Sequence, residues 1–371
     1  MKILITGNMG YIGPVVVKRL RQSYPDATIC GFDMGYFATC LTNTVIFPEC
    51  AIDIQYYGDI RDVNIDFFNF NEIDVVVHLA AISNDPMGNR FDLVTKNVNY
   101  SASVKLARYA KMAGCKAFVF ASSCSVYGDA DDHQARTESS LLNPLTIYAR
   151  SKIATENSLQ ELADKSFKVT CLRFATACGM SDRLRLDLVL NDFVASAVVN
   201  KKITILSDGT PWRPLIDVHD MARAIDWAIA RDINDGGEFL AINTGSNANN
   251  YQVKELAEIV ADVITGVEIE INKDAAPDKR SYQVNFDLFK KLAPDYQPQI
   301  NLKSTIETLA DALKQMKFSD SAFRDSNLIR LKVLNNLIKR RLLDNDLRWI
   351  FKKSSSRIKR VEWAGWAGGN A

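Results

Sequence analysis

Short apolar runs alternate with helical patterns through the first half of the chain. Each run is rich in β-branched or other apolar residues, which is typical of buried strands. The run at 74–81 is almost wholly apolar, as expected for a parallel strand covered on both faces. Strands that alternate with helices predict an α/β fold with a doubly wound parallel sheet. Strands are predicted at 1–5, 28–32, 54–58, 74–81, 116–122 and 168–174, and helices at 14–20, 93–113 and 148–162.

The pattern changes after residue 180. Shorter elements and turn signals such as Asp235-Gly236-Gly237 follow, which predict a smaller C-terminal lobe over residues 181–317. We expect this lobe to cover the carboxyl ends of the strands and to bind substrate. The sheet domain is expected to span 1–180, with some later segments returning to it.

Residues 318–371 differ again in composition. They hold twelve Lys or Arg residues and five Asp or Glu residues, so the rest of the chain is net negative. Apolar residues from Leu328 to Leu342 recur at helical spacing. This pattern predicts a terminal helix packed on the body with a basic face in solvent. A partner-docking or membrane-surface role for 357–366 is the alternative.

Composition narrows the function classes. The chain has 371 residues, 47% of them apolar, and a net charge of +1, so nothing global indicates binding to nucleic acid. No apolar run is long enough to span a membrane. Seven scattered cysteines form no metal-ligand spacing, so we predict no metal site and reduced thiols in the cytoplasm. The predicted first strand leaves no room for a signal peptide.

A glycine-spaced turn at 6–13 lies between the first predicted strand and the first predicted helix. Glycines permit a sharp turn and a close approach of a pyrophosphate, and the helix N-terminus offers N–H groups to that anion. Asp33 follows the second strand, 20 residues after Gly13. A carboxylate there accepts ribose hydroxyl groups and repels a 2′-phosphate, so the pattern predicts NAD rather than NADP.

Tyr148 and Lys152 are four residues apart, on one face of a predicted helix. A phenol is a poor base at neutral pH, but a nearby cation favours the phenolate. The pair is suited to taking a proton from a substrate hydroxyl as hydride leaves the same carbon. A serine at the end of the strand at 116–122 would bridge the substrate oxygen and the tyrosine.

Together these motifs resemble the extended short-chain dehydrogenase/reductases, and most of all their nucleotide-sugar epimerase/dehydratase branch. The resemblance covers about residues 1–315. It implies a Rossmann-type domain, tightly held NAD, a nucleoside-diphosphate sugar as substrate and a Ser–Tyr–Lys catalytic set. The motifs that carry it are Thr6-Gly-x-x-Gly-x-x-Gly13, Asp59-Ile60, His78-Leu79-Ala80-Ala81, Ser122-Ser123-x-x-Val126-Tyr127-Gly128 and Tyr148-x-x-x-Lys152.

The resemblance also assigns roles to individual residues. The catalytic set falls on Ser123, Tyr148 and Lys152, Asp59 and Ile60 would contact the adenine, and the stretch from Leu79 to Ala81 would pass under the cofactor. The residues assigned to the cofactor are Gly7, Met9, Gly10, Tyr11, Ile12, Gly13, Asp33, Met34, Asp59, Ile60, Leu79, Ala80, Ala81, Asn97, Tyr148 and Lys152.

Further matches lie in the second lobe. Arg213 and Arg280 stand where the family grips the substrate diphosphate, and a guanidinium fork suits that group. Asn191 stands where the family holds the nucleotide. Ser123 and Thr176 complete the residues assigned to the substrate.

The chain departs from the family pattern at several positions. The family's 4,6-dehydratases carry Asp and Glu after the catalytic Ser or Thr, whereas this chain has Cys124 and Ser125, so dehydration is disfavoured. Thr176 stands where many 4-epimerases carry Asn. Arg183 and Arg185 are either plain surface charges or ligands for an acidic sugar.

The leading hypothesis is therefore an NAD-dependent nucleotide-sugar epimerase that acts through a transient keto-sugar. A decarboxylase or reductase of the same sugars is the alternative, and a non-catalytic NAD-binding scaffold is a third hypothesis. By resemblance, we also expect a homodimer formed by the helices near 93–113 and 146–163.

Overall fold

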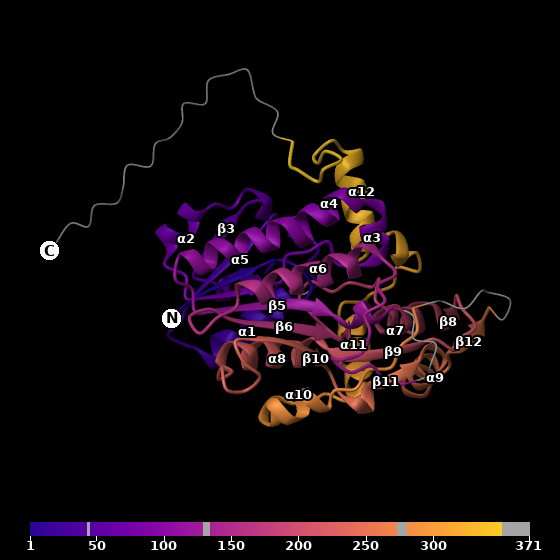
Figure 1. The fold of residues 1–371 in the computed structure, drawn as a ribbon. Coiled ribbons are helices and arrows are strands. Elements are labelled where there is room, and N and C mark those ends of the chain that lie inside the picture. The colour runs from indigo at the N-terminus through magenta and orange to yellow at the C-terminus, as the bar shows by residue number, and fades with distance from the viewer. Residues whose placement is uncertain (43–44, 129–133, 273–279, 351–371) are drawn as a thin grey trace, which may run out of the picture.

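The computed structural model describes residues 1–42, 45–128, 134–272 and 280–350. Its centre is a seven-stranded sheet in the order β10-β6-β5-β4-β1-β2-β3, in which every neighbouring pair is parallel (Figure 1). The predicted doubly wound α/β sheet is confirmed. The strands are β1 (Lys2–Thr6), β2 (Thr28–Asp33), β3 (Ile54–Tyr57), β4 (Val75–His78), β5 (Ala117–Ser123), β6 (Lys168–Phe174) and β10 (Phe239–Thr244).

Helices cover both faces of this sheet. On one face α1 (Gly13–Ser23) packs against α8 (Val218–Ala230), and on the other α5 (Ser103–Met112) packs against α6 (Ile147–Leu162). Successive strand residues point to opposite faces. Thus Ile3 belongs to the core under α1, whereas Leu4 belongs to the core under α5. This two-sided burial explains why the strands read as continuous apolar runs.

The helix predicted at 93–113 is interrupted. It consists of α4 (Asp92–Lys96), a π-helical turn over Asn97–Ala102, and α5. The wider turn rotates the residues after position 96 relative to an ideal α-helix, so the 3.6-residue period does not predict which of them face inward.

The chain after residue 180 divides between the sheet and the smaller lobe. The elements α8 and β10 return to the main sheet, with β10 pairing along β6. The remaining strands form two small sheets, β11-β9-β7 and β12-β8. The lobe comprises β7 (Thr176–Cys178), α7 (Val189–Asn200), β8 (Lys202–Ile205), β9 (Trp212–Asp217), β11 (Asn250–Gln252), α9 (Val253–Val263), β12 (Glu268–Ile271) and α11 (Leu302–Gln315). The helix α10 (Asp287–Leu292) instead packs beside β10 and α8 of the main sheet.

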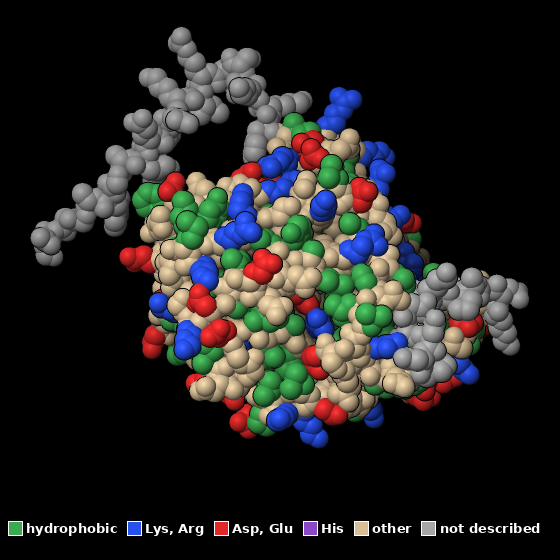
Figure 2. All heavy atoms as spheres, viewed as in Figure 1, with side chains coloured by type: hydrophobic (Ala, Val, Ile, Leu, Met, Phe, Trp, Pro, Cys, Tyr) green, Lys and Arg blue, Asp and Glu red, His purple; other side chains and the backbone are tan. Residues whose placement is uncertain are grey.

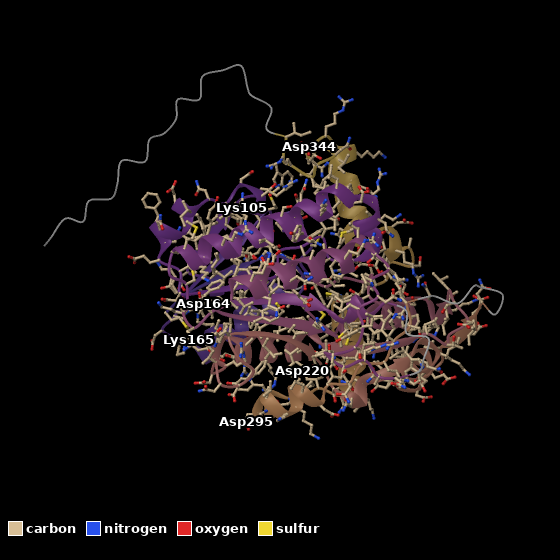
Figure 3. All side chains as sticks on the ribbon, viewed as in Figure 1. Lys105, Asp164, Lys165, Asp220, Asp295 and Asp344 are labelled. Atoms are coloured by element: carbon tan, nitrogen blue, oxygen red, sulfur yellow. The ribbon has the colours of Figure 1, made fainter. Side chains whose placement is uncertain are left out.

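The C-terminal residues return to the opposite side of the molecule. The helix α12 (Arg330–Lys339) lies beside α3 (Asp85–Arg90), near α4 (Figure 1). Asp344, labelled in Figure 3, belongs to the turn that follows α12. Residues 357–366, for which the sequence left a docking role open, lie outside the described residues.

A membrane-spanning helix and a metal-ligating cluster are both absent from the part of the chain that the structure describes. It contains no helix long and apolar enough to cross a membrane. It also contains no group of three metal-ligating side chains of the His, Cys, Asp and Glu types. The seven cysteines are free thiols, and only Cys50 among them is exposed.

A buried ion pair between α6 and β6 gives a stability prediction. Glu156 and Arg173 have side chains 3% and 7% exposed, with Arg173 Nη2 donating to Glu156 Oε2 at 2.7 Å. Replacing Glu156 by Gln leaves a buried guanidinium without its counter-charge, so we expect a loss of about 3–5 kcal/mol. Urea unfolding would measure it.

The matched control is Glu258→Gln, because Glu258 pairs with Lys254 and both side chains are about half exposed. Such a surface pair contributes at most about 1 kcal/mol. Equal losses in the two variants would contradict the interpretation of the buried pair.

Candidate functional site

A cavity of about 970 Å³ opens at the carboxyl ends of the parallel strands, between the sheet and the smaller lobe. This is the edge where open α/β sheets bind ligands. Its wall includes most of the residues assigned from the sequence: Gly7, Gly10, Tyr11, Ile12, Asp33, Met34, Asp59, Ile60, Leu79, Ala80, Ala81, Ser123, Tyr148, Lys152, Thr176, Arg213 and Arg280.

The glycine turn lies close to the end of β4. Gly7 has a φ of 75°, and a Cβ there would lie 2.6 Å from the backbone nitrogen of Ala80. A Cβ on Gly13 would lie 2.1 Å from the carbonyl oxygen of Asn8. Helix α1 begins without a side-chain cap or an acidic residue in its first turn, so its positive end stays available to an anion.

Asp33 is held against the same turn. Its carboxylate accepts the backbone N–H of Met9 at 3.0 Å and that of Gly35 at 2.7 Å. Burial raises the pKa of Asp33 above its ordinary value, although these two hydrogen bonds oppose the shift. A cradle for an anion and an acceptor for hydroxyl groups thus share one cavity, and these residues fit a dinucleotide.

The predicted catalytic side chains come together deeper in the cavity. Ser123 ends β5, and Tyr148 and Lys152 lie on the first turns of α6, which Thr146 caps. Tyr148 hydrogen bonds to Ser123. The Lys152 Nζ donates to the carbonyl oxygen of Ala121 at 2.6 Å and lies 5.5 Å from the centre of the Tyr148 ring.

Burial opposes ionisation of both groups. It raises the pKa of Tyr148 to about 12, although the hydrogen bond to Ser123 lowers it in part. Burial lowers the pKa of Lys152 to about 8. The polypeptide by itself therefore keeps Tyr148 protonated at neutral pH, and phenolate formation needs additional positive charge.

The opposite wall carries the two arginines assigned to a diphosphate. Arg213 lies on β9 and donates to the carbonyl oxygen of Trp212 at 2.8 Å. Arg280 forms an ion pair with Asp85 at 2.9 Å, across the mouth of the cavity. Asp85 also raises the pKa of Tyr148, so it links this rim to the catalytic group.

Arg183 and Arg185 are buried, so the interpretation as plain surface charges is wrong. Arg183 is 1% exposed and pairs with Glu49 at 2.6 Å. Arg185 pairs with Asp187 at 2.7 Å and lies in the cavity wall. Each guanidinium therefore already has a carboxylate partner.

Two assigned asparagines do not reach the cavity. The amide of Asn191 bonds to Gly179, Tyr11 and Arg185, behind the wall. Asn97 is exposed. The residue that faces inward is Asn99, whose amide holds both backbone groups of Ile82 at 2.8 and 3.0 Å. Met9 and Gly13 lie behind the wall as parts of the turn.

Of the two residues after Ser123, only Ser125 reaches the cavity. Cys124 is 1% exposed, its thiol donates to the carbonyl oxygen of Arg173, and burial raises its pKa. Ser125 lines the cavity, and its hydroxyl is buried without a hydrogen-bond partner. Neither side chain is an acid of the kind that a dehydratase uses at these positions.

Sequence reasoning missed several residues of the wall. Asn84 and Asp85 begin α3, and Asn84 donates to Asp187 at 2.8 Å. An Asn followed by Asp-Pro is a helix-start signal, which was the available clue. Arg330 and Leu334 of α12 also line the cavity, and no motif indicated that the C-terminal helix reaches it.

Comparison with known proteins gives one family. A model described as "NAD dependent epimerase/dehydratase family" matches residues 3–245. A Methanocaldococcus jannaschii protein named putative UDP-glucose 4-epimerase is 26% identical over 317 residues, which are 84% of this chain and 98% of that protein. The Mus musculus dTDP-D-glucose 4,6-dehydratase is 28% identical over 288 residues, which are 75% of this chain and 78% of that protein.

Solved structures share the fold. UDP-glucose 4-epimerase of Thermotoga maritima, solved with UDP-glucose, has a TM-score of 0.72 at 22% identity and covers 85% of this chain and 100% of its own. UDP-glucuronic acid 4-epimerase of Bacillus cereus, solved with UDP-glucuronic acid and NAD, has a TM-score of 0.72 at 23% identity with the same coverage. This chain is longer than both by about the length of residues 318–371.

Proposed function

The chain belongs to the NAD dependent epimerase/dehydratase family, and we propose that it is a nucleotide-sugar epimerase acting through a transient keto-sugar. NAD is the cofactor of this family. The observation that carries the proposal is the convergence of Ser123, Tyr148 and Lys152 in a cavity that also holds a dinucleotide cradle and two arginines.

The cofactor is assigned to the sheet side of the cavity. The turn from Gly7 to Gly13 would hold its diphosphate, Asp33 would accept hydroxyl groups of the adenosine ribose, and Asp59 would face the adenine. When bound, NAD accepts hydride from a sugar carbon and returns it, and its oxidised ring carries a positive charge.

The remaining chemistry falls to the chain. Tyr148 takes the proton of the sugar hydroxyl and later returns it, and Ser123 holds the same oxygen through a hydrogen bond. Lys152 supplies a positive charge beneath the Tyr148 ring, which favours the phenolate. Arg213 and Arg280 hold the diphosphate while the sugar beyond it turns its other face to the cofactor.

The groups that line the cavity favour epimerisation over dehydration. Dehydration needs an acid to protonate the leaving hydroxyl and a base to remove a carbon-bound proton. Cys124 is buried away from the wall with a raised pKa, and Ser125 is a neutral hydroxyl. Relatives with both activities match this chain, so this argument rests on these two positions.

A decarboxylase receives less support. A sugar carboxylate would need a cation, but Glu49 already neutralises Arg183 and Asp187 already neutralises Arg185. We therefore propose a neutral sugar as the substrate.

The proposed homodimer would use the helices near 93–113 and 146–163. They lie on the face viewed in Figure 2, where hydrophobic side chains gather between charged ones. Leu93 and Met112 of this region are 61% and 72% exposed. Both exposed apolar residues belong to the segment 93–113, and they support a two-fold contact through it.

The preference for NAD over NADP tests the role of Asp33. The wild type should bind NAD more tightly than NADP, because the Asp33 carboxylate would meet the 2′-phosphate. Asp33→Ala should weaken NAD binding and reduce the difference between the affinities for NAD and NADP. Calorimetric titration of both cofactors measures this, and tighter binding of NADP to the wild type would refute the assignment.

Tyr148→Phe should keep the fold and cofactor binding but lower turnover about 10²–10⁴-fold, because it removes only the oxygen that transfers the proton. Ser123→Ala should cost less, because it removes one hydrogen bond and leaves the base in place. Turnover by each variant on the true substrate should be compared with circular dichroism and NAD content. An unaltered rate for Tyr148→Phe would exclude it from the mechanism.

The product distinguishes the reaction classes. We expect a product of unchanged mass with one inverted sugar centre when the protein is incubated with a panel of nucleotide sugars and no added NADH. Mass spectrometry and NMR would follow the reaction. A loss of about 18 Da would mean dehydration, and a loss of about 44 Da would mean decarboxylation. A requirement for added reduced cofactor would mean a reductase.

A further inference from the structure

Residues 328–350, called here the strap, pass from the smaller lobe to the sheet side of the cavity. The strap begins beside Leu186, whose N–H donates to the carbonyl oxygen of Leu328 at 2.9 Å. It then forms α12 beside α3, near α4 (Figure 1), and ends in a turn that contacts the residues that follow β3. It lies after residues 3–245, which the family model matches.

The strap is docked by a buried apolar cluster. Leu334, Leu343 and Leu347 are at most 1% exposed. Fully burying a leucine contributes about 1.5–3 kcal/mol, so three of them hold the strap firmly on the body. Their partners come from the segment that follows β4 and from α3 and α4: Ile82, Met87, Phe91 and Val94.

Polar contacts join the end of the strap to the segment that follows Asp33. The indole Nε1 of Trp349 donates to the carbonyl oxygen of Met34 at 2.7 Å. The hydroxyl of Tyr36 donates to the carbonyl oxygen of Leu347. Because Asp33 lies in the cavity wall one residue before Met34, the strap fixes the backbone on which this carboxylate stands.

A second set of contacts reaches the adenine side. Arg348 pairs with Asp62 at 2.6 Å and with Asp59 at 3.4 Å. The guanidinium of Arg61 hydrogen bonds to the carboxylate of Asp59. It also donates to the carbonyl oxygen of Asp346 at 2.8 Å. The strap thus contacts both acids that are assigned to the adenosine part of the cofactor, directly at Asp59 and through Met34 at Asp33.

Arg330 extends from the strap into the cavity wall. It is 1% exposed, its Nη2 donates to the carbonyl oxygen of Arg183 at 2.6 Å, and its guanidinium lies 4.7 Å from the centre of the Phe37 ring. Its Nη1 has no hydrogen-bond partner. Burial and the charges of Arg185 and Arg183 lower the pKa of Arg330 to about 10. A buried cation with an unmade hydrogen bond is costly, and an anion in the cavity would offset that cost.

We propose that the strap is part of the cofactor site. It closes the adenosine end of the cavity and directs the charge of Arg330 toward the cofactor diphosphate, so NAD stays bound from one turnover to the next. This inference rests on the placement of NAD given under Proposed function.

The experiment measures the exchange of bound NAD in the full-length protein. Wild type and variants are loaded with NAD and mixed with excess isotopically labelled NAD, and mass spectrometry of the extracted cofactor gives the dissociation rate. Trp349→Phe removes one N–H with little change in shape, and Arg330→Met removes the charge but keeps most of the volume. We expect each to speed exchange at least about tenfold. Lys332→Met is the control, because Lys332 forms an exposed ion pair within the same region.

Four outcomes would overturn the strap proposal. Exchange at the wild-type rate in Trp349→Phe, with an unchanged unfolding temperature, overturns the strap proposal even if Arg330→Met fails to fold. An equal acceleration by Lys332→Met overturns it as well. Asp33→Ala tests the placement of NAD on which the proposal rests. If this variant leaves the exchange rate unchanged, both the placement of NAD and the strap proposal are wrong. If Asp33→Ala speeds exchange but both strap variants do not, only the strap proposal fails.

Discussion

The close approach of the turn after β1 to the end of β4 is the constraint on which the cavity depends. The backbone of Gly7 lies so close to Ala80 that a side chain at position 7 would collide with it. The two segments are also joined by a hydrogen bond from the backbone N–H of Leu79 to the carbonyl oxygen of Thr6 at 3.0 Å. This contact makes the floor of the cavity from backbone atoms, which leaves room for a flat ligand above it. Because all seven strands run parallel, the same edge also carries Asp33 at one end and Ser123 towards the other.

Burial of charge is the second determinant of the site. Burial raises the pKa of Tyr148 and lowers that of Lys152, so the polypeptide disfavours the ionised forms of both groups. Positive charge close to the phenol changes this balance most where the dielectric is low. The base is therefore expected to work when the cavity holds an oxidised cofactor and to stay protonated when it does not. In the proposed mechanism, proton transfer by Tyr148 therefore depends on the bound cofactor.

Features set by local sequence were predictable, and features set by distant contacts were not. The strands, the glycine turn and the Tyr148–Lys152 pair follow from patterns a few residues long. By contrast, propensities do not indicate the π-helical turn over Asn97–Ala102, which leaves Asn97 exposed and Asn99 buried. The burial of Arg183 depends on Glu49, which is 134 residues away, and the pair of Asp85 with Arg280 joins residues 195 apart. Pairings at such separations arise only from the packed fold.

The strap bears on the choice between reaction classes. An enzyme that uses reduced NAD as a co-substrate must release and rebind it in each turnover, so a closed adenosine end would slow it. An epimerase returns its cofactor to the starting redox state and needs no exit for it. Anchors on Met34 and Asp59, together with a buried leucine cluster, would oppose release of the cofactor at this end. The same contacts that would impede a reductase suit any redox-neutral reaction, so they count against the reductase, while the choice of an epimerase over a dehydratase still rests on Cys124 and Ser125.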